Sequence, residues 1–330
     1  MKSYIVITEK FSVEATVTLT TALKSANLAE VVKLSASSEL TEHLAKATGL
    51  IIRSKTKITR ELLAEAPNLK LIITCTSGFD HIDLVATQEK NIHVMYTPNA
   101  NAQSAAELTW GLILNTHRPI LESHKQIKAG TWDREKLPAG FELAGKTIGI
   151  VGLGRIGQKI ATFAKAFSMN VVAFDPYQED EVFENFKLER SSYEELLKQS
   201  DIITFHVPLT KETKNMMNRS HFEYTNKDVV LINASRGSVI NEDDLVDALD
   251  EGVVRMCGLD VFAKEPLSRE SKLLKSPKVV LTQHIGAMTE QAFAKASMEA
   301  VNLCIDFLKT NKTQNTLPFQ NNCGSMMFND

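Results

Sequence analysis

Three short polar segments contain the side chains whose types are best suited to chemistry. Arg236, Glu265 and His284 each come shortly after an apolar run that is typical of a buried strand. Ligands of an open α/β sheet bind outside the carboxyl ends of its strands, so these side chains are expected around one crevice. Taken singly, Arg and Glu could be plain turn residues and His a packing residue. Their shared placement favours the functional interpretation.

These residue types match what a 2-hydroxy acid requires from a protein. An arginine holds a carboxylate through two parallel hydrogen bonds, a role that Arg236 could fill. A histidine takes and returns a hydroxyl proton near neutral pH, which makes His284 the candidate general acid and base. Glu265 would hydrogen-bond the second imidazole nitrogen. We therefore predict Arg236, Glu265 and His284 as catalytic residues.

A glycine-rich segment earlier in the chain has the spacing of a dinucleotide site. It reads Gly-x-Gly-x-x-Gly directly after an apolar run and directly before an amphipathic stretch. Gly152 permits a tight turn, Gly154 lets the backbone approach a pyrophosphate, and Gly157 lets helix and strand pack closely. Asp175 ends the next predicted strand, 18 residues on (175 − 157 = 18), where a carboxylate can bind the ribose hydroxyls. Because that carboxylate would repel a 2′-phosphate, we predict NAD as the cofactor; a simple strand-ending turn is the alternative.

Alternating apolar runs and amphipathic segments predict the elements that position these residues. Five short strands alternate with helices between residues 4 and 97, and six more strands follow between residues 147 and 281. Such alternation predicts parallel sheets that are covered on both faces. A long helical stretch at 102–128 separates the two series, and another helix is expected at about 290–309. The predicted fold class is α/β, with two doubly wound parallel-sheet domains.

The composition limits the function classes. The chain has 330 residues and a formal net charge of −3, without a basic stripe, so nucleic acid is not an expected partner. The first apolar run is too short for a secretory signal, and no later run approaches the ~18 apolar residues of a membrane span. The cysteines are far apart and are expected to be reduced, packed thiols rather than disulfides or metal ligands: Cys75, Cys257, Cys304 and Cys323. We predict a cytoplasmic protein with no membrane partner and no metal.

Taken together, the motifs resemble those of the D-isomer-specific 2-hydroxyacid dehydrogenase family over about residues 45–310. The segments that carry the resemblance are Gly152-Leu-Gly-Arg-Ile-Gly157, Asn233-Ala-Ser-Arg-Gly237, Leu259-Asp-Val-Phe262 with Glu265-Pro266, and His284-Ile-Gly-Ala287. The resemblance implies an oxidoreductase that moves a hydride between nicotinamide and C2 of a D-2-hydroxy or 2-keto acid. It also implies catalytic roles for the arginine, glutamate and histidine singled out above. Gln283 departs from the family, because a proline commonly precedes the histidine.

The resemblance further assigns cofactor-binding residues. The amides of Arg155 and Ile156 would meet the pyrophosphate, and Asp260 would hold the nicotinamide amide. The full set expected around NAD is Gly152, Gly154, Arg155, Ile156, Gly157, Asp175, His206, Val207, Pro208, Thr213, Ala234, Asp260 and Ala287.

The resemblance also implies the domain organisation. A Rossmann NAD-binding domain at 101–285 would be inserted in a flavodoxin-like substrate domain made of 1–100 and 286–330. Family members pair through their cofactor domains, and the 102–128 stretch resembles the pairing element, so a homodimer is expected. The Asn-rich end, 311–330, is expected to be partly disordered.

Several segments resemble the branch of the family that oxidises 3-phosphoglycerate, in a short form without a regulatory domain. Arg53 and Arg134 would add cations for a phosphate, although surface or dimer salt bridges are an equal alternative. Ser77 and Gly78 would offer backbone N–H groups to the substrate carboxylate, and Asn99 lies in another similar segment. Ser77 stands where the family more often has Gly or Thr.

Two other functions remain open from the sequence. A glyoxylate/hydroxypyruvate or D-lactate-type reductase would share the chemistry and differ only in substrate. An NAD(H)-sensing, co-repressor-like binding protein would keep the same motifs and bind a protein partner. No sequence feature demands such a partner, which favours an enzyme acting on a small anionic acid.

Overall fold

The computed structural model describes residues 2–36 and 39–317, and the chain divides into two compact units. Unit 1 comprises Met1–Ala102 and Ala287–Asp330, and unit 2 comprises Gln103–Gly286. Unit 2 is therefore an insertion in the chain of unit 1. Cys323 and residues 318–330 of the Asn-rich end lie outside the described residues.

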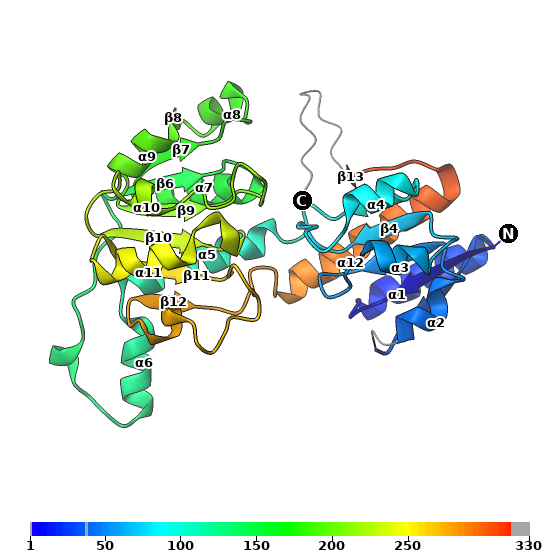
Figure 1. The fold of residues 1–330 in the computed structure, drawn as a ribbon, viewed down its shortest axis with the longest axis horizontal. Helices are drawn as coiled ribbons and strands as arrows, with labels where there is room; N and C mark the ends of the chain where they lie inside the picture. Colours follow the sequence, from blue (N-terminus) through cyan, green and yellow to red (C-terminus); the bar gives the residue numbers. More distant parts are fainter. Residues whose placement is uncertain (1, 37–38, 318–330) are drawn as a thin grey trace. The chain divides into compact units, whose positions relative to one another are not determined.

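Unit 1 is built on a six-stranded sheet in the order β13-β5-β4-β3-β1-β2. Figure 1 labels β4 and β13 of this sheet and the helices α1, α2, α3, α4 and α12 of the same unit. The first five strands of the sheet pair in parallel, in the order 2-1-3-4-5 that is typical of flavodoxin-like domains. β13 adds an antiparallel edge strand beside β5, so part of the Asn-rich end is ordered. The strands are β1 (Ser3–Ile7), β2 (Ala29–Lys33), β3 (Gly49–Ile52), β4 (Leu71–Thr74), β5 (His93–Tyr96) and β13 (Thr316–Leu317).

Alternating side chains of this sheet enter two separate cores. Ile5 and Ile73 pack with α1 and α12 on one face, whereas Val6 and Ile72 pack with the three other helices on the opposite face. Helix starts are marked by polar caps; the Ser12 side chain accepts a hydrogen bond from the Ala15 N–H at the start of α1. The helices are α1 (Val13–Ser25), α2 (Leu40–Leu44), α3 (Arg60–Ala64), α4 (Leu84–Glu89) and α12 (Glu290–Thr310).

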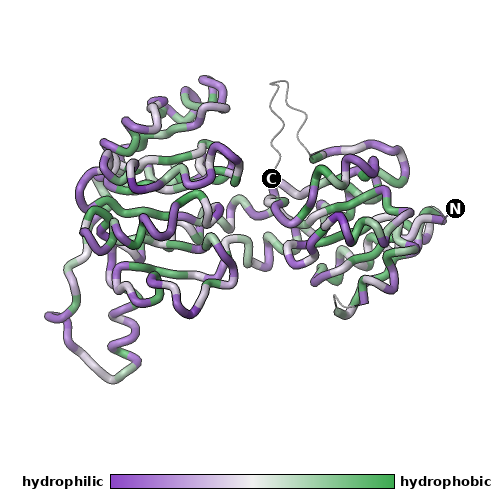
Figure 2. Tube along the Cα trace, in the orientation of Figure 1, coloured by the Kyte–Doolittle hydropathy of each residue, from purple (hydrophilic) through white to green (hydrophobic). Residues whose placement is uncertain are grey.

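Unit 2 contains a seven-stranded sheet in the order β12-β11-β10-β9-β6-β7-β8, in which every pairing is parallel. Read from β8, this is the 3-2-1-4-5-6 order of the Rossmann fold with one further strand. Figure 2 shows that the strands of both units are largely hydrophobic. The strands are β6 (Thr147–Val151), β7 (Asn170–Phe174), β8 (Glu189–Arg190), β9 (Ile202–Phe205), β10 (Val229–Asn233), β11 (Val254–Leu259) and β12 (Val279–Leu281).

Helices cover both faces of this sheet. Residues of α5 and α7 pack on one face around Ile148 and Ile150, and residues of α9 and α11 pack on the other around Phe205 and Leu231. The helices are α5 (Ala102–His117), α6 (Ile120–Lys128), α7 (Arg155–Ala166), α8 (Asp180–Asn185), α9 (Tyr193–Gln199), α10 (Arg219–Phe222) and α11 (Glu242–Asp250), with short 3-10 turns η2 (Arg134–Lys136), η3 (Gly237–Val239) and η4 (Lys272–Lys275).

The prediction of one long helix at 102–128 was wrong. α5 ends at His117 and α6 begins at Ile120. Pro119 lies between them, and proline lacks the N–H that a helix interior requires and clashes with the preceding turn. No helix among the described residues is long and apolar enough to cross a membrane.

Candidate active site

His284 and Glu265, two of the predicted catalytic residues, are in direct contact. His284 Nδ1 lies 2.8 Å from Glu265 Oε2, and the second carboxylate oxygen accepts a hydrogen bond from the Phe262 N–H at 3.1 Å. Both side chains are partly exposed, at 49% for His284 and 37% for Glu265. The carboxylate fixes one ring nitrogen, so Nε2 is the nitrogen left for an external proton.

Asp260 organises the loop that carries His284. Its side chain is fully buried and accepts hydrogen bonds from the Thr282 hydroxyl, the Ile285 N–H and the Gly286 N–H at 2.6–2.9 Å. Its backbone oxygen accepts a fourth, from the His284 N–H. His284 adopts a left-handed conformation with φ of 57°, which costs about 1 kcal/mol or more for a non-glycine residue. The four bonds to Asp260 hold that conformation.

Arg236 lies in a turn that packs directly against the Glu265 loop. Asn233 shapes the turn: its side chain accepts from the Ser235 N–H and donates to the Arg236 carbonyl at 2.9 Å. A Cβ atom on Gly237 would lie 1.9 Å from the Phe262 carbonyl carbon, so the two backbones are in close contact. Arg236 Nη1 donates to the Ser235 carbonyl at 2.7 Å. The structure thus brings all three predicted catalytic residues to neighbouring loops of unit 2.

The glycine-rich loop fits a dinucleotide phosphate. Gly152 has φ of 94°, and a Cβ there would lie 2.6 Å from the His206 carbonyl oxygen. A Cβ on Gly157 would lie 2.1 Å from the Gly152 oxygen, whereas one on Gly154 would meet open space. α7 begins after Gly154 with no side-chain cap and no acidic residue in its first turn. The amides at the helix start, including those of Arg155 and Ile156, are therefore available to an anion.

Asp175 lies beside this loop. Its Oδ2 accepts a hydrogen bond from the Leu153 N–H at 2.8 Å, and its Oδ1 accepts one from the Tyr177 N–H at 2.9 Å. The carboxylate is thus fixed at the carboxyl end of β7, next to the glycine loop, as a ribose-binding acid would be.

The predicted adenine-site residues lie on the segment after β9. The His206 N–H donates to the Val151 carbonyl at 2.7 Å, and the ring nitrogen Nε2 lies 2.9 Å from the Thr204 hydroxyl. Burial lowers the pKa of His206 to about 3, so its ring is neutral at physiological pH. Val207 and Pro208 follow, and the Thr213 hydroxyl donates to the Pro208 carbonyl at 2.6 Å. Ala234, also assigned to the cofactor, lies in the Arg236 turn and is partly buried.

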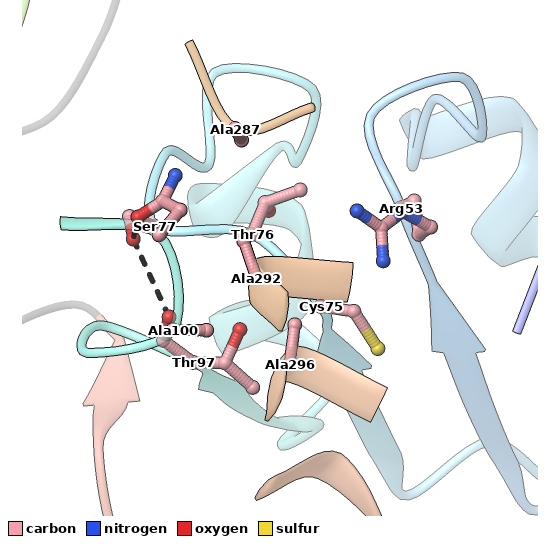
Figure 3. A pocket seen from close by; sticks show the side chains of 10 residues that line it. Arg53, Cys75, Thr76, Ser77, Thr97, Ala100, Ala287, Ala292 and Ala296 are labelled. Atoms are coloured by element: carbon pink, nitrogen blue, oxygen red, sulfur yellow. Dashed lines mark hydrogen bonds between the residues drawn. The ribbon is translucent and has the colours of Figure 1, made fainter. Parts of the chain in front are cut away.

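Unit 1 contains a small pocket of about 30 Å³ that is lined by both polar and apolar side chains (Figure 3). Its lining includes Arg53 Nη1 and Thr97 Oγ1, two buried polar atoms for which the described residues provide no hydrogen-bond partner. Such groups are costly unless a ligand or water satisfies them. A space of this size holds one or two water-sized groups. The Arg53 guanidinium also lies 5.1 Å from the centre of the Phe293 ring.

Sequence reasoning identified only part of this pocket. Arg53 and Ser77 line it, as does Ala287, which was assigned to the cofactor. Gly78 and Asn99 do not line it, and Asn99 is exposed; Arg134 belongs to unit 2, in the turn η2. The pocket residues that the sequence did not single out are Cys75, Thr76, Thr97, Ala100, Asn101, Ala292 and Ala296.

Within this pocket Asn101 has a defined partner. The Ser77 hydroxyl donates to Asn101 Oδ1 at 2.5 Å, so both side chains are fixed at the pocket wall. The sequence pointed to Asn99 as a substrate residue, whereas the structure shows that its neighbours Thr97 and Asn101 line the cavity.

Comparison with known proteins gives consistent matches. Residues 110–286 match the family model described as D-isomer specific 2-hydroxyacid dehydrogenase, NAD binding domain. The chain is 43% identical over 255 residues to the D-3-phosphoglycerate dehydrogenase of Methanocaldococcus jannaschii, covering 77% of this chain and 48% of that protein. It is 38% identical over 265 residues to the hydroxypyruvate reductase of Thermotoga maritima, covering 80% of this chain and 85% of that protein.

Among solved structures, the D-lactate dehydrogenase of Aquifex aeolicus complexed with NAD and lactic acid is similar, with a TM-score of 0.81 and 30% identity. That match covers 93% of this chain and 96% of the other. The chain spans about half the length of the phosphoglycerate dehydrogenases that it matches.

Proposed function

Since this chain belongs to the D-isomer-specific 2-hydroxyacid dehydrogenase family, with unit 2 as its NAD-binding domain, we propose that it is an NAD-dependent oxidoreductase acting at C2 of a D-2-hydroxy or 2-keto acid. The observation that carries the proposal is the 2.8 Å contact between His284 and Glu265, on loops that pack against the Arg236 turn. In this proposal Arg236 is the cation for the carboxylate and His284 is the proton carrier for the hydroxyl.

Each catalytic residue has a defined task in this proposal. NAD, when bound, would supply or accept the hydride. Arg236 holds the substrate carboxylate through paired hydrogen bonds. His284 Nε2 takes the hydroxyl proton on oxidation and returns it on reduction, while Glu265 keeps Nδ1 protonated and stabilises the imidazolium that forms. Asp260, which the family resemblance assigns to the cofactor, is in addition a positioning residue in this scheme, because its bonds fix the His284 loop.

The cofactor residues keep their predicted roles in the proposal. The amides after Gly154 and the open space above it suit a pyrophosphate, and the Asp175 carboxylate suits the ribose hydroxyls. The remaining cofactor assignments, from His206–Pro208 and Thr213 to Ala234, Asp260 and Ala287, rest on the family resemblance.

For the substrate we propose a phosphorylated acid of the 3-phosphoglycerate type. The support is the unit 1 pocket, where Arg53 Nη1 and Thr97 Oγ1 are buried without partners. Phosphate oxygens would accept hydrogen bonds from donors of this kind, and the pocket of about 30 Å³ has room for one or two oxygen-sized groups. Ser77, Gly78, Asn99 and Arg134 stay as predicted substrate residues. Arg134 lies in unit 2 and is exposed.

Hydroxypyruvate is the second candidate substrate. The observation that favours it is the hydroxypyruvate reductase of Thermotoga maritima, 85% of whose length is covered by the match. The same catalytic residues would serve, and the Arg53 pocket would then bind a smaller polar group.

A substrate panel tests the function and separates these candidates. We would measure kcat/KM for 3-phosphoglycerate, hydroxypyruvate, glyoxylate, pyruvate and D-lactate with NAD(H) and NADP(H). We expect the highest value for the phosphorylated acid with NAD.

In Arg53→Ala the preference for the phosphorylated acid over hydroxypyruvate should fall on the order of 100-fold, because a charge-assisted contact worth about 3 kcal/mol is lost. A preference for hydroxypyruvate that Arg53→Ala leaves unchanged would select the second candidate. Absence of turnover with every acid would reject the enzyme and favour an NAD(H)-sensing binding protein.

We also propose a cytoplasmic homodimer that involves neither nucleic acid nor membranes. α6 supports the dimer, since none of its side chains is buried and Ile120, Leu121 and Ile127 are about half exposed. The three cysteines that the structure describes are buried and unpaired, as a reducing compartment would allow.

A further inference from the structure

A side-chain hydrogen bond joins the loop after β7 to the loop after β9. The Tyr177 hydroxyl donates to Glu212 Oε2. Tyr177 belongs to the loop after β7, and Glu212 to the loop after β9. In the sheet β6 lies between β7 and β9, so the Tyr177–Glu212 bond connects loops on either side of the strand that leads into the glycine turn.

Both ends of this bond are anchored to cofactor-site residues. The Tyr177 N–H donates to Asp175 Oδ1 at 2.9 Å, so the tyrosine and the predicted ribose-binding acid move together. Glu212 directly precedes Thr213, whose hydroxyl is tied to Pro208 at 2.6 Å and accepts from the Thr210 N–H at 2.8 Å. Glu212 is thus held by a structured loop rather than by a free surface segment.

The arrangement places a second carboxylate on the side of the site that already contains Asp175. The pKa of Tyr177 is raised, mainly by its hydrogen bond to Glu212, then by desolvation and by the negative charges of Glu212 and Asp175. Arg190 lies nearby, but its positive charge is already paired within its own loop region. Its guanidinium pairs with Asp180 at 2.8 Å and donates to the Asp175 carbonyl at 2.9 Å.

We propose that Glu212, held by Tyr177, is a second cofactor-specificity residue that adds to Asp175 in excluding a dinucleotide with a 2′-phosphate. The inference rests on the proposed cofactor site. It concerns charge: a 2′-phosphate carries close to two negative charges, and each nearby carboxylate raises the free energy of binding it. NAD lacks that group, so Glu212 should affect its binding little.

The test is the ratio of dissociation constants for NADPH and NADH, measured by cofactor fluorescence without turnover. In Glu212→Gln the amide still accepts the tyrosine hydrogen bond, but the charge is gone. We expect the ratio to fall about three-fold to ten-fold at low ionic strength, mainly through tighter NADPH binding, the size of one screened unit charge. The change should shrink in 0.5 M salt, where the screening length is only about 4 Å.

Three further variants sharpen the result. Asp250→Asn also removes one negative charge. Asp250 ends α11 and precedes the amino end of β11, whereas the predicted cofactor residues follow the carboxyl ends of the strands, so the ratio of NADPH to NADH dissociation constants should not change. Tyr177→Phe keeps both carboxylates and releases Glu212, so its effect should be smaller than that of Glu212→Gln. Asp175→Ala should lower the ratio most.

The outcomes separate this inference from the proposed function. If Asp175→Ala lowers the ratio and Glu212→Gln does not, Glu212 has no role in specificity, although the cofactor site stands. A Glu212→Gln effect that is independent of salt would likewise overturn the inference, because it would reflect a contact and not a charge. Failure of the unmodified protein to bind either dinucleotide would overturn both proposals.

Discussion

Glu265 and Asp260 divide the task of fixing His284. Glu265 contacts the ring at Nδ1 and Asp260 holds the loop backbone, so ring orientation and loop conformation depend on different carboxylates. The two carboxylates also differ in exposure, in keeping with these two roles. Asp260 is fully buried among hydrogen-bond donors, whereas Glu265 is about a third exposed beside a ring that must reach a substrate. Substitutions at the two positions should therefore fail in different ways.

Glu265→Gln should impair chemistry far more than it impairs the fold. The carboxylate accepts hydrogen bonds from both Nδ1 and the Phe262 N–H, whereas the amide has one acceptor oxygen, so one of the two bonds is lost and the neutral side chain no longer stabilises the imidazolium. We expect kcat/KM to fall roughly 10-fold to 100-fold, less than the ~10²–10⁴-fold contribution of the general acid or base itself because His284 is retained, with a loss of about 1–3 kcal/mol in stability and an unchanged NADH dissociation constant. Glu270→Gln, at an exposed carboxylate of the same segment, is the matched control. A Glu265→Gln value within two-fold of the unmodified protein would remove the carboxylate from the mechanism.

His206 predicts a dependence of stability on pH. Burial lowers its pKa to about 3, whereas an unfolded histidine has a pKa near 6.5. Below about pH 6.5 the unfolded state therefore binds a proton that the folded state excludes, and the free energy of unfolding falls as the pH drops towards 3, by up to about 1.4 kcal/mol per pH unit for this one proton. His206→Gln should show a shallower decline across that window. Urea unfolding at several pH values measures the difference, and parallel declines in the two proteins would contradict it.

At the scale of elements, glycines decide which loops can meet. Gly237 allows the Arg236 turn to rest on the Phe262 backbone, and Gly157 allows α7 to pack on the glycine turn. Neither close contact leaves room for a Cβ atom. The sheet orders then bring the loops after β10, β11 and β12 to one edge, because these strands are parallel neighbours.

Gly237→Ala tests the first of these contacts. Its methyl group would lie 1.9 Å from the Phe262 carbonyl carbon, so the backbone must shift. We expect a loss of about 1–3 kcal/mol in the free energy of unfolding, as for other overpacked sites, and a larger relative loss of kcat/KM because Arg236 moves. Gly111→Ala is the control, since a Cβ there meets nothing within 4 Å. Equal stability and activity in the two variants would show that the contact is not required.

The sequence predicted most of the longer elements well, apart from the single helix expected at 102–128, and it missed several short ones. Buried strands such as β6 and β10 are nearly continuous apolar runs, and α7 and α11 have clear starts at Gly154 and Asn241. α8, β8, α10 and β13 span only two to six residues, and too few side chains are involved to give a periodic signal. β13 also depends on pairing with a strand about 220 residues away, which no local pattern records.

The candidate site likewise has residues that the sequence could indicate and residues that it could not. Arg236, Glu265 and His284 were predictable because each follows a recognisable strand and the strands are parallel neighbours. Thr97 and Asn101 were not, because which residues of the 97–101 segment turn inwards depends on loop geometry and on the bond from Ser77. Tyr177 and Glu212 were likewise missed, since they are 35 residues apart and meet only through the sheet order.

At the scale of the whole molecule, α6 is a helix of unit 2 that exposes several apolar side chains close together. Apolar side chains scattered singly on a surface need no explanation, but α6 presents several within nine residues, and Trp132 just beyond it is 82% exposed. α6 also has charged residues around these apolar positions, as an interface helix between copies would. The helix therefore has the character of an association surface, and a second copy of this chain is the partner that the proposed homodimer supplies.

Ile127→Glu in α6 tests that assembly. A charge buried in a dimer interface without a partner costs several kcal/mol, so we expect the dimer to dissociate at micromolar concentrations while each monomer remains folded. Light scattering after size-exclusion chromatography gives the mass, and circular dichroism reports the fold. Val17→Glu on α1 replaces an apolar residue that is 59% exposed in unit 1, and it should leave the mass unchanged. A charge at this position is harmless if α6 faces solvent. Two results would therefore show that α6 is not the pairing surface: an unmodified protein with the mass of one chain, or a dimer that persists in Ile127→Glu.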